Sequence, residues 1–267
     1  MAVFPGRDAW QAAATQLRRE QGNEMGKGLP ASLLALIVVT GCVSCSPYSG
    51  AAETRLALGM HYLAADDFVA ARRNFQRAQA AAPRDYRMAL ALARLAEKQG
   101  RRDEAARDYQ QAQRLAPTNG YVANNYGAFL CALGQYDEAH QQFKRAMSAS
   151  ESEARIDAWE LSGYCYLQAE DMLAARAALS RALGANRAKG DALLDEAEKQ
   201  RPLYPARALL LMELYQQYLP ATARSLELQI RFAAQQGNAA DVTRYGDRLA
   251  RSFPQSIQYQ RYLANEY

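Results

Sequence analysis

Small and large apolar residues recur along this chain at a constant spacing, beginning near residue 52. Three of the recurring positions hold glycine or alanine, a fourth an aromatic residue and a fifth proline: Gly59, Ala93 and Gly127; Ala71, Ala105 and Ala139; Ala78, Ala112 and Ala146; Phe75, Tyr109 and Phe143; Pro83 and Pro117. Two antiparallel helices approach closely only where the residues between them are small, aromatic side chains fill the remaining gaps, and a proline ends the second helix. The pattern therefore predicts a row of helical hairpins, each packed on its neighbours.

The spacing and order of these residues match the tetratricopeptide repeat, which is about 34 residues long. The first copy is nearly complete from Leu58 to Pro83, whereas later copies are looser and the stretch from Leu183 to Leu203 follows the repeat poorly. The predicted fold class is all-α, a right-handed superhelical solenoid of about six tetratricopeptide repeats that form one domain over residues 52–256. We place the repeats at residues 52–85, 86–119, 120–153, 156–189, 187–220 and 223–256, with a carboxyl-terminal capping helix at 257–267.

The amino-terminal part of the chain has the features of a targeting signal. An uncharged apolar run at residues 29–39 follows Lys27 and ends in small residues. A basic residue, a short apolar core and small residues at its end are typical of a secretory signal peptide, which we assign to residues 25–41. At about 1.5 Å per residue, the run is too short to span a hydrocarbon core about 30 Å thick.

The sequence Val39-Thr40-Gly41-Cys42 at the end of this signal resembles the bacterial lipobox, in which a small residue precedes a cysteine that becomes lipidated. This predicts lipidation of Cys42 and a short tether over residues 42–51. Cys45 is a poorer site, because Cys42 would then stand where the motif prefers an aliphatic residue; a chance cysteine after an ordinary apolar segment is the remaining alternative. Residues 1–24 carry acidic residues that signal peptides rarely contain, so we interpret them as an over-extended start before Met25.

Composition and charge narrow the classes of function. With 49% hydrophobic residues the chain can bury a core, which excludes a disordered protein. Its 32 basic and 28 acidic residues are too balanced for a nucleic-acid binder. The two histidines, His61 and His140, lie in different repeats and are interpreted as structural or solvated. No phosphate loop, metal motif or nucleophile elbow occurs. We therefore expect neither an enzyme nor a cofactor or metal site.

Two cysteines, Cys131 and Cys165, lie on the first helices of adjacent predicted repeats. Neighbouring helices pack about 8–10 Å apart, so both a periplasmic disulfide and two buried thiols remain open. The register places Cys131 toward the inner groove and Cys165 away from it, and for this reason we favour two buried thiols.

The remaining chemistry lies on the surface of the solenoid. In this repeat, positions 2, 5, 9 and 12 of the first helix face the concave groove. Amide, aromatic, charged and aliphatic side chains in such a groove suit an extended or helical peptide, and tyrosine is favoured at interfaces. The predicted partner-binding residues are Arg87, Leu90, Arg94 and Glu97 in repeat two, Tyr121, Asn124 and Ala128 in repeat three, and Asp157, Glu160, Tyr164 and Leu167 in repeat four.

The block Tyr121-Val-Ala-Asn-Asn-Tyr-Gly-Ala-Phe-Leu130 resembles the type IV pilus biogenesis lipoproteins of the PilF/PilW family, as do the lipobox, the six repeats and a matching final segment. That segment comprises Ala223-Arg-Ser-Leu226, Arg244-Tyr-Gly246, Phe253-Pro254 and Tyr259-Gln260. The similarity extends over residues 42–267, whereas the segment 1–24 and the details of repeat five depart from the family.

The resemblance implies a pilotin, an outer-membrane lipoprotein that binds the type IV pilus secretin and promotes its outer-membrane localisation and multimerisation. It further implies a lipid-anchored protein on the periplasmic face of the outer membrane, and we expect a monomer. Two alternatives remain. One is a tetratricopeptide lipoprotein scaffold of another secretion or outer-membrane assembly system. The other is an enzyme of unrecognised type, which no residue pattern in the sequence supports.

Overall fold

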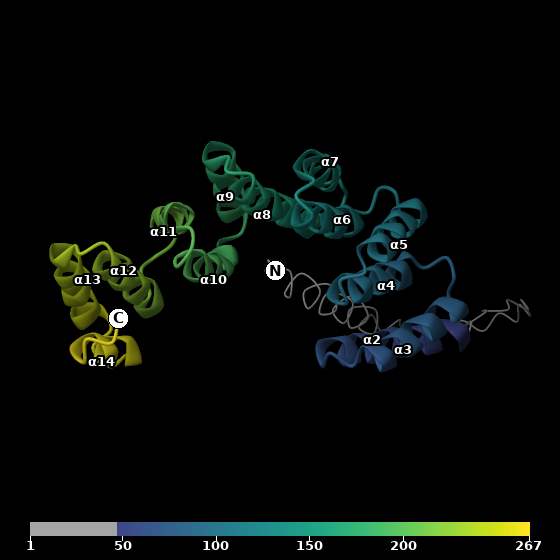
Figure 1. The fold of residues 1–267 in the computed structure, drawn as a ribbon, viewed down its shortest axis with the longest axis horizontal. Coiled ribbons are helices and arrows are strands. Elements are labelled where there is room, and N and C mark those ends of the chain that lie inside the picture. Colours follow the sequence, from purple (N-terminus) through teal and green to yellow (C-terminus); the bar gives the residue numbers. More distant parts are fainter. Residues whose placement is uncertain (1–46) are drawn as a thin grey trace, which may run out of the picture. The chain divides into compact units, whose positions relative to one another are not determined.

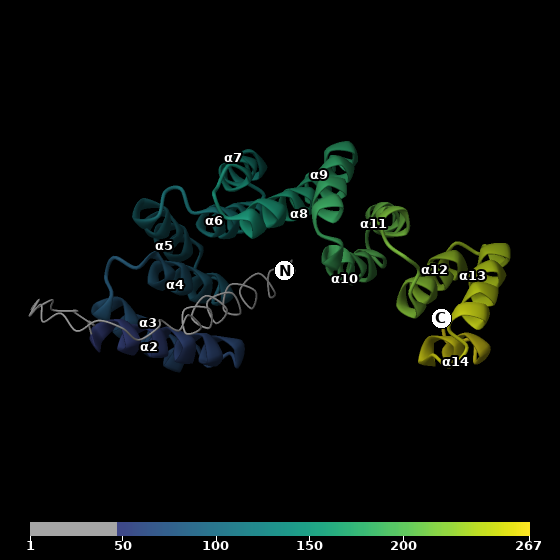
Figure 2. The ribbon, with the colours of Figure 1, turned by 180° about the vertical axis from the view of Figure 1, so that it is seen from behind.

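The computed structural model describes residues 47–267, and the segments assigned above to the extended start, the signal peptide and the lipidated Cys42 fall outside this range. Within it, all regular structure is helical: thirteen α-helices, numbered α2 to α14, and one 3-10 turn, η1. Figure 1 labels these helices along the chain, and Figure 2 shows them from behind. None of the described helices is long and apolar enough to cross a membrane.

The helices follow the order of the predicted repeats, and within each of two compact units consecutive helices pack on one another. The chain divides into two compact units, the first ending at Ala132 and the second beginning at Leu133. The first unit contains α2 (Pro47–Ala64), α3 (Phe68–Ala81), α4 (Tyr86–Lys98), α5 (Arg102–Leu115) and α6 (Gly120–Ala132). The second contains α7 (Tyr136–Met147), α8 (Ser152–Gln168), α9 (Met172–Ala185), η1 (Arg187–Lys189), α10 (Gly190–Gln200), α11 (Pro205–Tyr218), α12 (Ala223–Gln235), α13 (Ala239–Ser252) and α14 (Ile257–Leu263).

The column of small residues allows the paired helices to approach closely. A β-carbon built at Gly59 of α2 would lie 2.4 Å from the ring of Phe75 on α3, and one at Gly163 of α8 would lie 2.5 Å from Cγ of Leu179 on α9. Real β-carbons do not come so close to other atoms. Phe75 and Leu179 are themselves fully or almost fully buried. The packing within each pair therefore depends on the residue pattern that identified the repeat.

The turns that follow α2, α4, α6, α8 and α12 each use one residue in the left-handed backbone region, and the turn after α10 does not. Gly100, Gly134 and Gly237 occupy it with φ of 72°, 78° and 69°, a conformation that glycine adopts without steric cost. At the corresponding turns after α2 and α8 the residues are Asp66 and Glu170, with φ of 58° and 65°. The aspartate caps Asp67 and Asp171 then begin the next helix, each accepting a hydrogen bond from the backbone N–H three residues on.

The first and last helices of the described chain, α2 and α14, show how its two ends are built. Helix α2 begins at Pro47, so residues 47–51, assigned above to the tether, are helical. Proline suits the first turn of a helix because its missing N–H would have no partner there. At the other end, Tyr259 and Tyr262 of α14 pack on a core of Leu226, Ile230 and Leu249 from α12 and α13. Because α14 has no fully buried residue, it covers this core as a capping helix.

Candidate partner-binding surfaces

Helix α4 carries the four predicted groove residues of the second repeat. Arg87 is held in place: its Nη2 lies 2.6 Å from Oδ2 of Asp85 and 3.0 Å from Oε2 of Glu53. The hydrogen bond that Arg87 donates to Asp85 is the main cause that raises the pKa of Arg87 above its ordinary value. Leu90 is only 2% exposed and belongs to the core. The other two candidates on α4, Arg94 and Glu97, do not belong to the buried core.

Arg94 and Glu97 form a polar centre that the surrounding protein covers only in part. Arg94 is half-buried and Glu97 is exposed to solvent. The Tyr109 hydroxyl donates a hydrogen bond of 2.7 Å to Oε2 of Glu97. Loss of surrounding water is the main cause of two opposite shifts: it lowers the pKa of Arg94 and raises the pKa of Glu97. Both charged forms therefore have less hydration than on an open surface.

Helix α6 places the third-repeat candidates at different depths. Tyr121 and Ala128 are half-buried, and Asn124 is buried. The Tyr121 carbonyl accepts a hydrogen bond of 2.8 Å from Nδ2 of Asn125. Tyr121 and Ala128 thus remain accessible to a partner, while Asn124 lies inside the packing.

An aromatic cluster supports this side of the first unit. The Tyr109 ring stacks on Tyr126 with centroids 5.7 Å apart and packs against Phe129 at 5.0 Å. Such pairs contribute beyond the area they bury. Because Tyr109 is 1% exposed, its hydroxyl and the Glu97 carboxylate are held in a fixed position.

Helix α8 carries the fourth-repeat candidates, and the second unit encloses them. Asp157, Glu160, Tyr164 and Leu167 are 7%, 8%, 2% and 1% exposed. Nζ of Lys189, at the end of η1, lies 2.5 Å from Oδ1 of Asp157 and 2.7 Å from Oε2 of Glu160. The Tyr164 hydroxyl lies 3.4 Å from Oε1 of Glu160. These residues are brought together, and their polar groups bind one another.

The electrostatics of this cluster follow from burial and pairing. Burial raises the pKa of Glu160, and the Lys189 ammonium opposes the shift. Burial by itself would lower the pKa of Lys189, but the two carboxylates raise it above its ordinary value. Lys189 therefore stays charged and the cluster acts as an internal ion triad.

The sequence reasoning did not identify Lys189. It lies in the stretch where two predicted repeats overlap and the pattern is weak. A usable signal was present: a basic residue 32 positions after Asp157, close to one repeat length, can face acidic residues of the preceding first helix.

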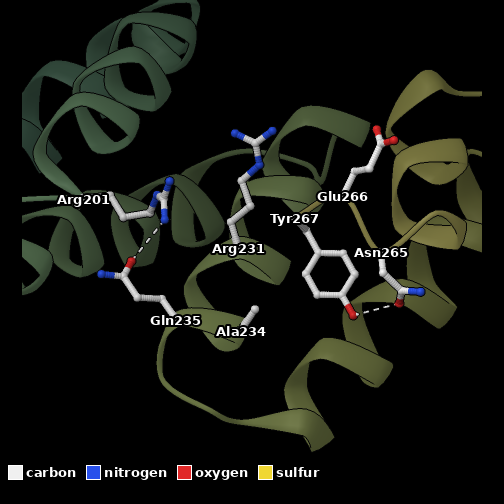
Figure 3. Close-up of a pocket in the computed structure, with 7 residues that line it drawn as sticks. All are labelled: Arg201, Arg231, Ala234, Gln235, Asn265, Glu266 and Tyr267. Atoms are coloured by element: carbon white, nitrogen blue, oxygen red, sulfur yellow. Dashed lines mark hydrogen bonds between the residues drawn. The ribbon is translucent and has the colours of Figure 1, made fainter.

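A second group that the sequence reasoning missed lines an open pocket of about 600 Å³ in the second unit (Figure 3). Its residues come from the end of α10, from α12 and from the segment after α14: Arg201, Arg231, Ala234, Gln235, Asn265, Glu266 and Tyr267. Nη1 of Arg201 donates a hydrogen bond of 3.1 Å to Oε1 of Gln235, one repeat later in the chain. Arg201 directly follows α10 and Arg231 lies in α12. Basic residues near the ends of successive first helices are the sequence signal that indicates this pocket.

The cysteines correct an expectation. Cys131 and Cys165 are both disulfide-bonded, whereas the register argument favoured two buried thiols. Both side chains are buried, at 1% and 0% exposure. The idealised assignment of one to the groove and the other to the opposite side therefore does not describe their surroundings, and it gave no valid reason against oxidation.

His140 is held by packing. Its ring stacks on Tyr166 with centroids 3.8 Å apart, and Nδ1 lies 3.3 Å from Oγ of Ser162. Burial lowers its pKa, and His61 is exposed. Among residues 47–267 there is no group of three side chains suited to hold a metal ion.

Comparison with known proteins gives one consistent group of relatives. The family model described as "Tetratricopeptide repeat" matches residues 56–120 and 130–192. The type IV pilus assembly protein PilF of Pseudomonas aeruginosa is 32% identical over 146 residues, which cover 54% of this chain and 57% of PilF, so the match spans little more than half of that relative. An uncharacterised protein of Haemophilus influenzae is 31% identical over 139 residues, 51% of this chain and 78% of its own length.

Two solved structures agree with this result over a longer part of the chain. The structure of P. aeruginosa PilF matches with a TM-score of 0.57 at 26% identity and covers 82% of this chain and 99% of its own. That of PilW, described as a widely conserved type IV pilus biogenesis factor, matches with a TM-score of 0.57 at 25% identity and covers 79% and 98%.

Proposed function

The chain belongs to the tetratricopeptide-repeat proteins of the PilF/PilW type IV pilus biogenesis family, and from this premise we propose that it is a pilotin. In this proposal a lipid on Cys42 anchors the protein to the periplasmic face of the outer membrane. The solenoid binds the pilus secretin and promotes its localisation and multimerisation there. In this proposal the protein acts by binding other proteins, because tetratricopeptide scaffolds are in general interaction modules.

The accessible polar centre of the first unit carries the binding part of the proposal. Glu97 is exposed, and Arg94 and Tyr121 are half-buried, so all three predicted groove residues present hydrogen-bonding groups that a partner can reach. The pKa shifts of Arg94 and Glu97 indicate that both are partly withdrawn from water. A peptide that offers an amide or an opposite charge would replace the lost hydration, which is how polar groups in a groove give specificity.

The binding proposal is tested by recovering the secretin from an envelope extract with the tagged full-length protein and its variants. We expect Arg94→Ala and Tyr121→Ala to reduce recovery strongly. Arg77→Ala is the matched control, because Arg77 is an exposed residue of α3 outside the predicted groove positions. Failure of the wild-type protein to recover any secretin would overturn the proposal in favour of a scaffold for another envelope assembly.

The anchoring proposal has its own test. One buried acyl chain gives only marginal membrane binding, whereas several chains anchor a protein stably. Cys42→Ala should release the protein from the outer membrane and reduce the secretin multimers recovered there, while Cys45→Ala should leave both unchanged. Normal multimers with Cys42→Ala would show that the anchor is not needed.

A further inference from the structure

The pocket between the end of α10, α12 and the segment after α14 combines two guanidinium groups with an amide and an aromatic ring. Figure 3 shows Arg201 and Gln235 directed toward one another on one side of it and the Tyr267 ring on the other. Arg201, Gln235 and Arg231 all lie along its lining. Arginine and tyrosine are the residues that contribute most often to binding energy in protein interfaces.

The two arginines differ in how their charge is compensated. Nη1 of Arg231 lies 3.3 Å from Oε1 of Glu198, and its Nη2 lies 3.2 Å from Oε1 of Glu227. Arg201 instead donates to a neutral amide, Gln235, and the described residues give it no ion pair. Arg231 is thus held rigidly by carboxylates, and Arg201 is the cation whose charge is balanced least.

Both arginines also keep a donor without a partner. Nε of Arg201 and Nε of Arg231 are buried and have no hydrogen-bond partner in the described chain. Buried donors are nearly always satisfied in folded proteins, and exceptions call for an explanation. Both atoms belong to residues that line the same pocket, so the arginines of this pocket have hydrogen-bonding capacity that the fold does not use.

We propose that this pocket binds a carboxylate of a protein partner, with Arg201 as the principal donor. The planar fork of a guanidinium fits the two oxygens of a carboxylate. Gln235 orients Arg201, and Tyr267 offers a wall for the apolar part of the residue that bears the carboxylate, while Arg231 lines the pocket with its charge already paired to Glu198 and Glu227. The carboxylate comes from an Asp or Glu side chain or from a chain terminus.

The Glu266 carboxylate is the group in the pocket that opposes this ligand. It lines the same space and forms no ion pair with the described residues, so its charge repels an incoming anion. Neutralising it should strengthen binding, which gives the proposal a variant with the opposite sign from the removal of Arg201.

The inference that the ligand belongs to a protein partner rests on the proposed function. The inference that the pocket binds a carboxylate can be wrong independently of it. If the wild-type protein recovers the secretin but shows no carboxylate selectivity, only this inference is wrong. If it recovers no secretin but selects carboxylates, only the proposed function is wrong.

The test is fluorescence anisotropy with the full-length protein in detergent at low ionic strength and three labelled peptides of one Gly/Ser sequence containing one Tyr. The first ends in a free carboxylate, the second is amidated, and the third is amidated with one internal Glu. We expect the amidated neutral peptide to bind at least about tenfold more weakly than one or both acidic peptides, the loss typical of one hydrogen bond to a charged group. The comparison of the two acidic peptides identifies the source of the carboxylate.

Arg201→Gln should remove this selectivity, Arg201→Lys should restore part of it, and Glu266→Gln should increase affinity by a few-fold. A circular dichroism melt of each variant shows that the helices remain folded. Equal binding of neutral and acidic peptides, selectivity that survives Arg201→Gln, or binding to anionic lipid vesicles in place of peptides would overturn the proposal.

Discussion

Two of the predicted groove positions, the second and ninth of the first helix, are partly exposed in repeats two and three and buried in repeat four. In the first unit Arg94, Glu97 and Tyr121 remain accessible. In the second, Asp157 and Glu160 are buried against Lys189. Tyr121 and Asp157 occupy the same repeat position, and so do Arg94 and Tyr164, so the position alone does not make a binding residue. What differs is whether the following segment supplies a side chain that satisfies the polar groups internally.

Removing Lys189 should have the largest effect and would break the comparison directly. Lys189→Ala leaves two buried carboxylates without their cation, and breaking a buried pair typically costs about 3–5 kcal/mol. The free energy of unfolding from urea titration measures this cost. Lys98→Ala is the control: its ion pair with Asp66 is exposed and contributes less than about 1 kcal/mol. Equal losses in the two variants would show that the triad has no special role.

A triple variant sharpens this test. Lys189→Met combined with Asp157→Asn and Glu160→Gln removes every charge of the triad and should restore most of the stability lost in Lys189→Ala, because neutral groups of similar size cost less to bury than unpaired charges. If the triple variant were as unstable as Lys189→Ala, the lost stability would come from packing and not from unpaired charge.

The next largest effect on stability is expected at the glycines of the packing column, which both units share. Gly59→Ala and Gly163→Ala introduce a β-carbon into the same packing column of the first and second units, where the neighbouring side chains lie 2.4 and 2.5 Å away. Each should lower the free energy of unfolding by about 1–3 kcal/mol. Gly184→Ala, where nothing lies within 4 Å of the added atom, should be neutral or stabilising. If only one column glycine were sensitive, the two units would not share one packing rule.

Smaller effects are expected at the turns. Gly100 in the first unit has φ of 72° and Glu170 in the second has φ of 65°. A left-handed conformation costs a residue with a β-carbon about 1–2 kcal/mol, so Gly100→Ala should lower stability by about 1 kcal/mol. Glu170→Gly should raise it by a few tenths to about 1 kcal/mol, since its exposed contact with Arg207 contributes little. Thermal melts compare the two, and equal signs would contradict this account.

The smallest effect is a pH dependence at the accessible centre. The pKa of Glu97 is raised above 4.5 mainly because surrounding protein removes water from the carboxylate. Its protonated form is therefore favoured in the folded state, and the chain loses stability as pH rises from about the unfolded pKa through the raised folded value. Glu97→Gln should flatten this part of the stability curve. A curve that stays unchanged would show that Glu97 is hydrated as on an open surface.

Much of the fold was predictable from the chain alone. The repeat columns located the helix pairs, because close helix packing admits only small residues at positions such as Gly59 and Ala71, and these leave a visible period. The start of α14 at Ile257 also agrees with the predicted capping helix. Helix α2 begins at Pro47, before the predicted start of the first repeat at residue 52, because helical residues after Pro47 carry no repeat signature.

The candidate site was predictable only as a set of positions. Arg94 and Tyr121 are accessible and Leu90 and Asn124 are buried, although all four share the same pattern. The amino-acid order specifies which side chains point to one face of a helix through the helical period. It does not specify the depth of that face, because depth depends on which atoms of the next repeat come to lie over it.

The amino-acid sequence thus determined the repeat and its spacing, since both depend on local helix packing that recurs in each hairpin. The folded molecule determined which polar groups remain available. Lys189 reaches back to Asp157 and Glu160 of the preceding first helix, and Arg201 reaches forward to Gln235 of the following one. Such contacts form between neighbouring repeats, where a single side chain either satisfies a charge or leaves it for a partner.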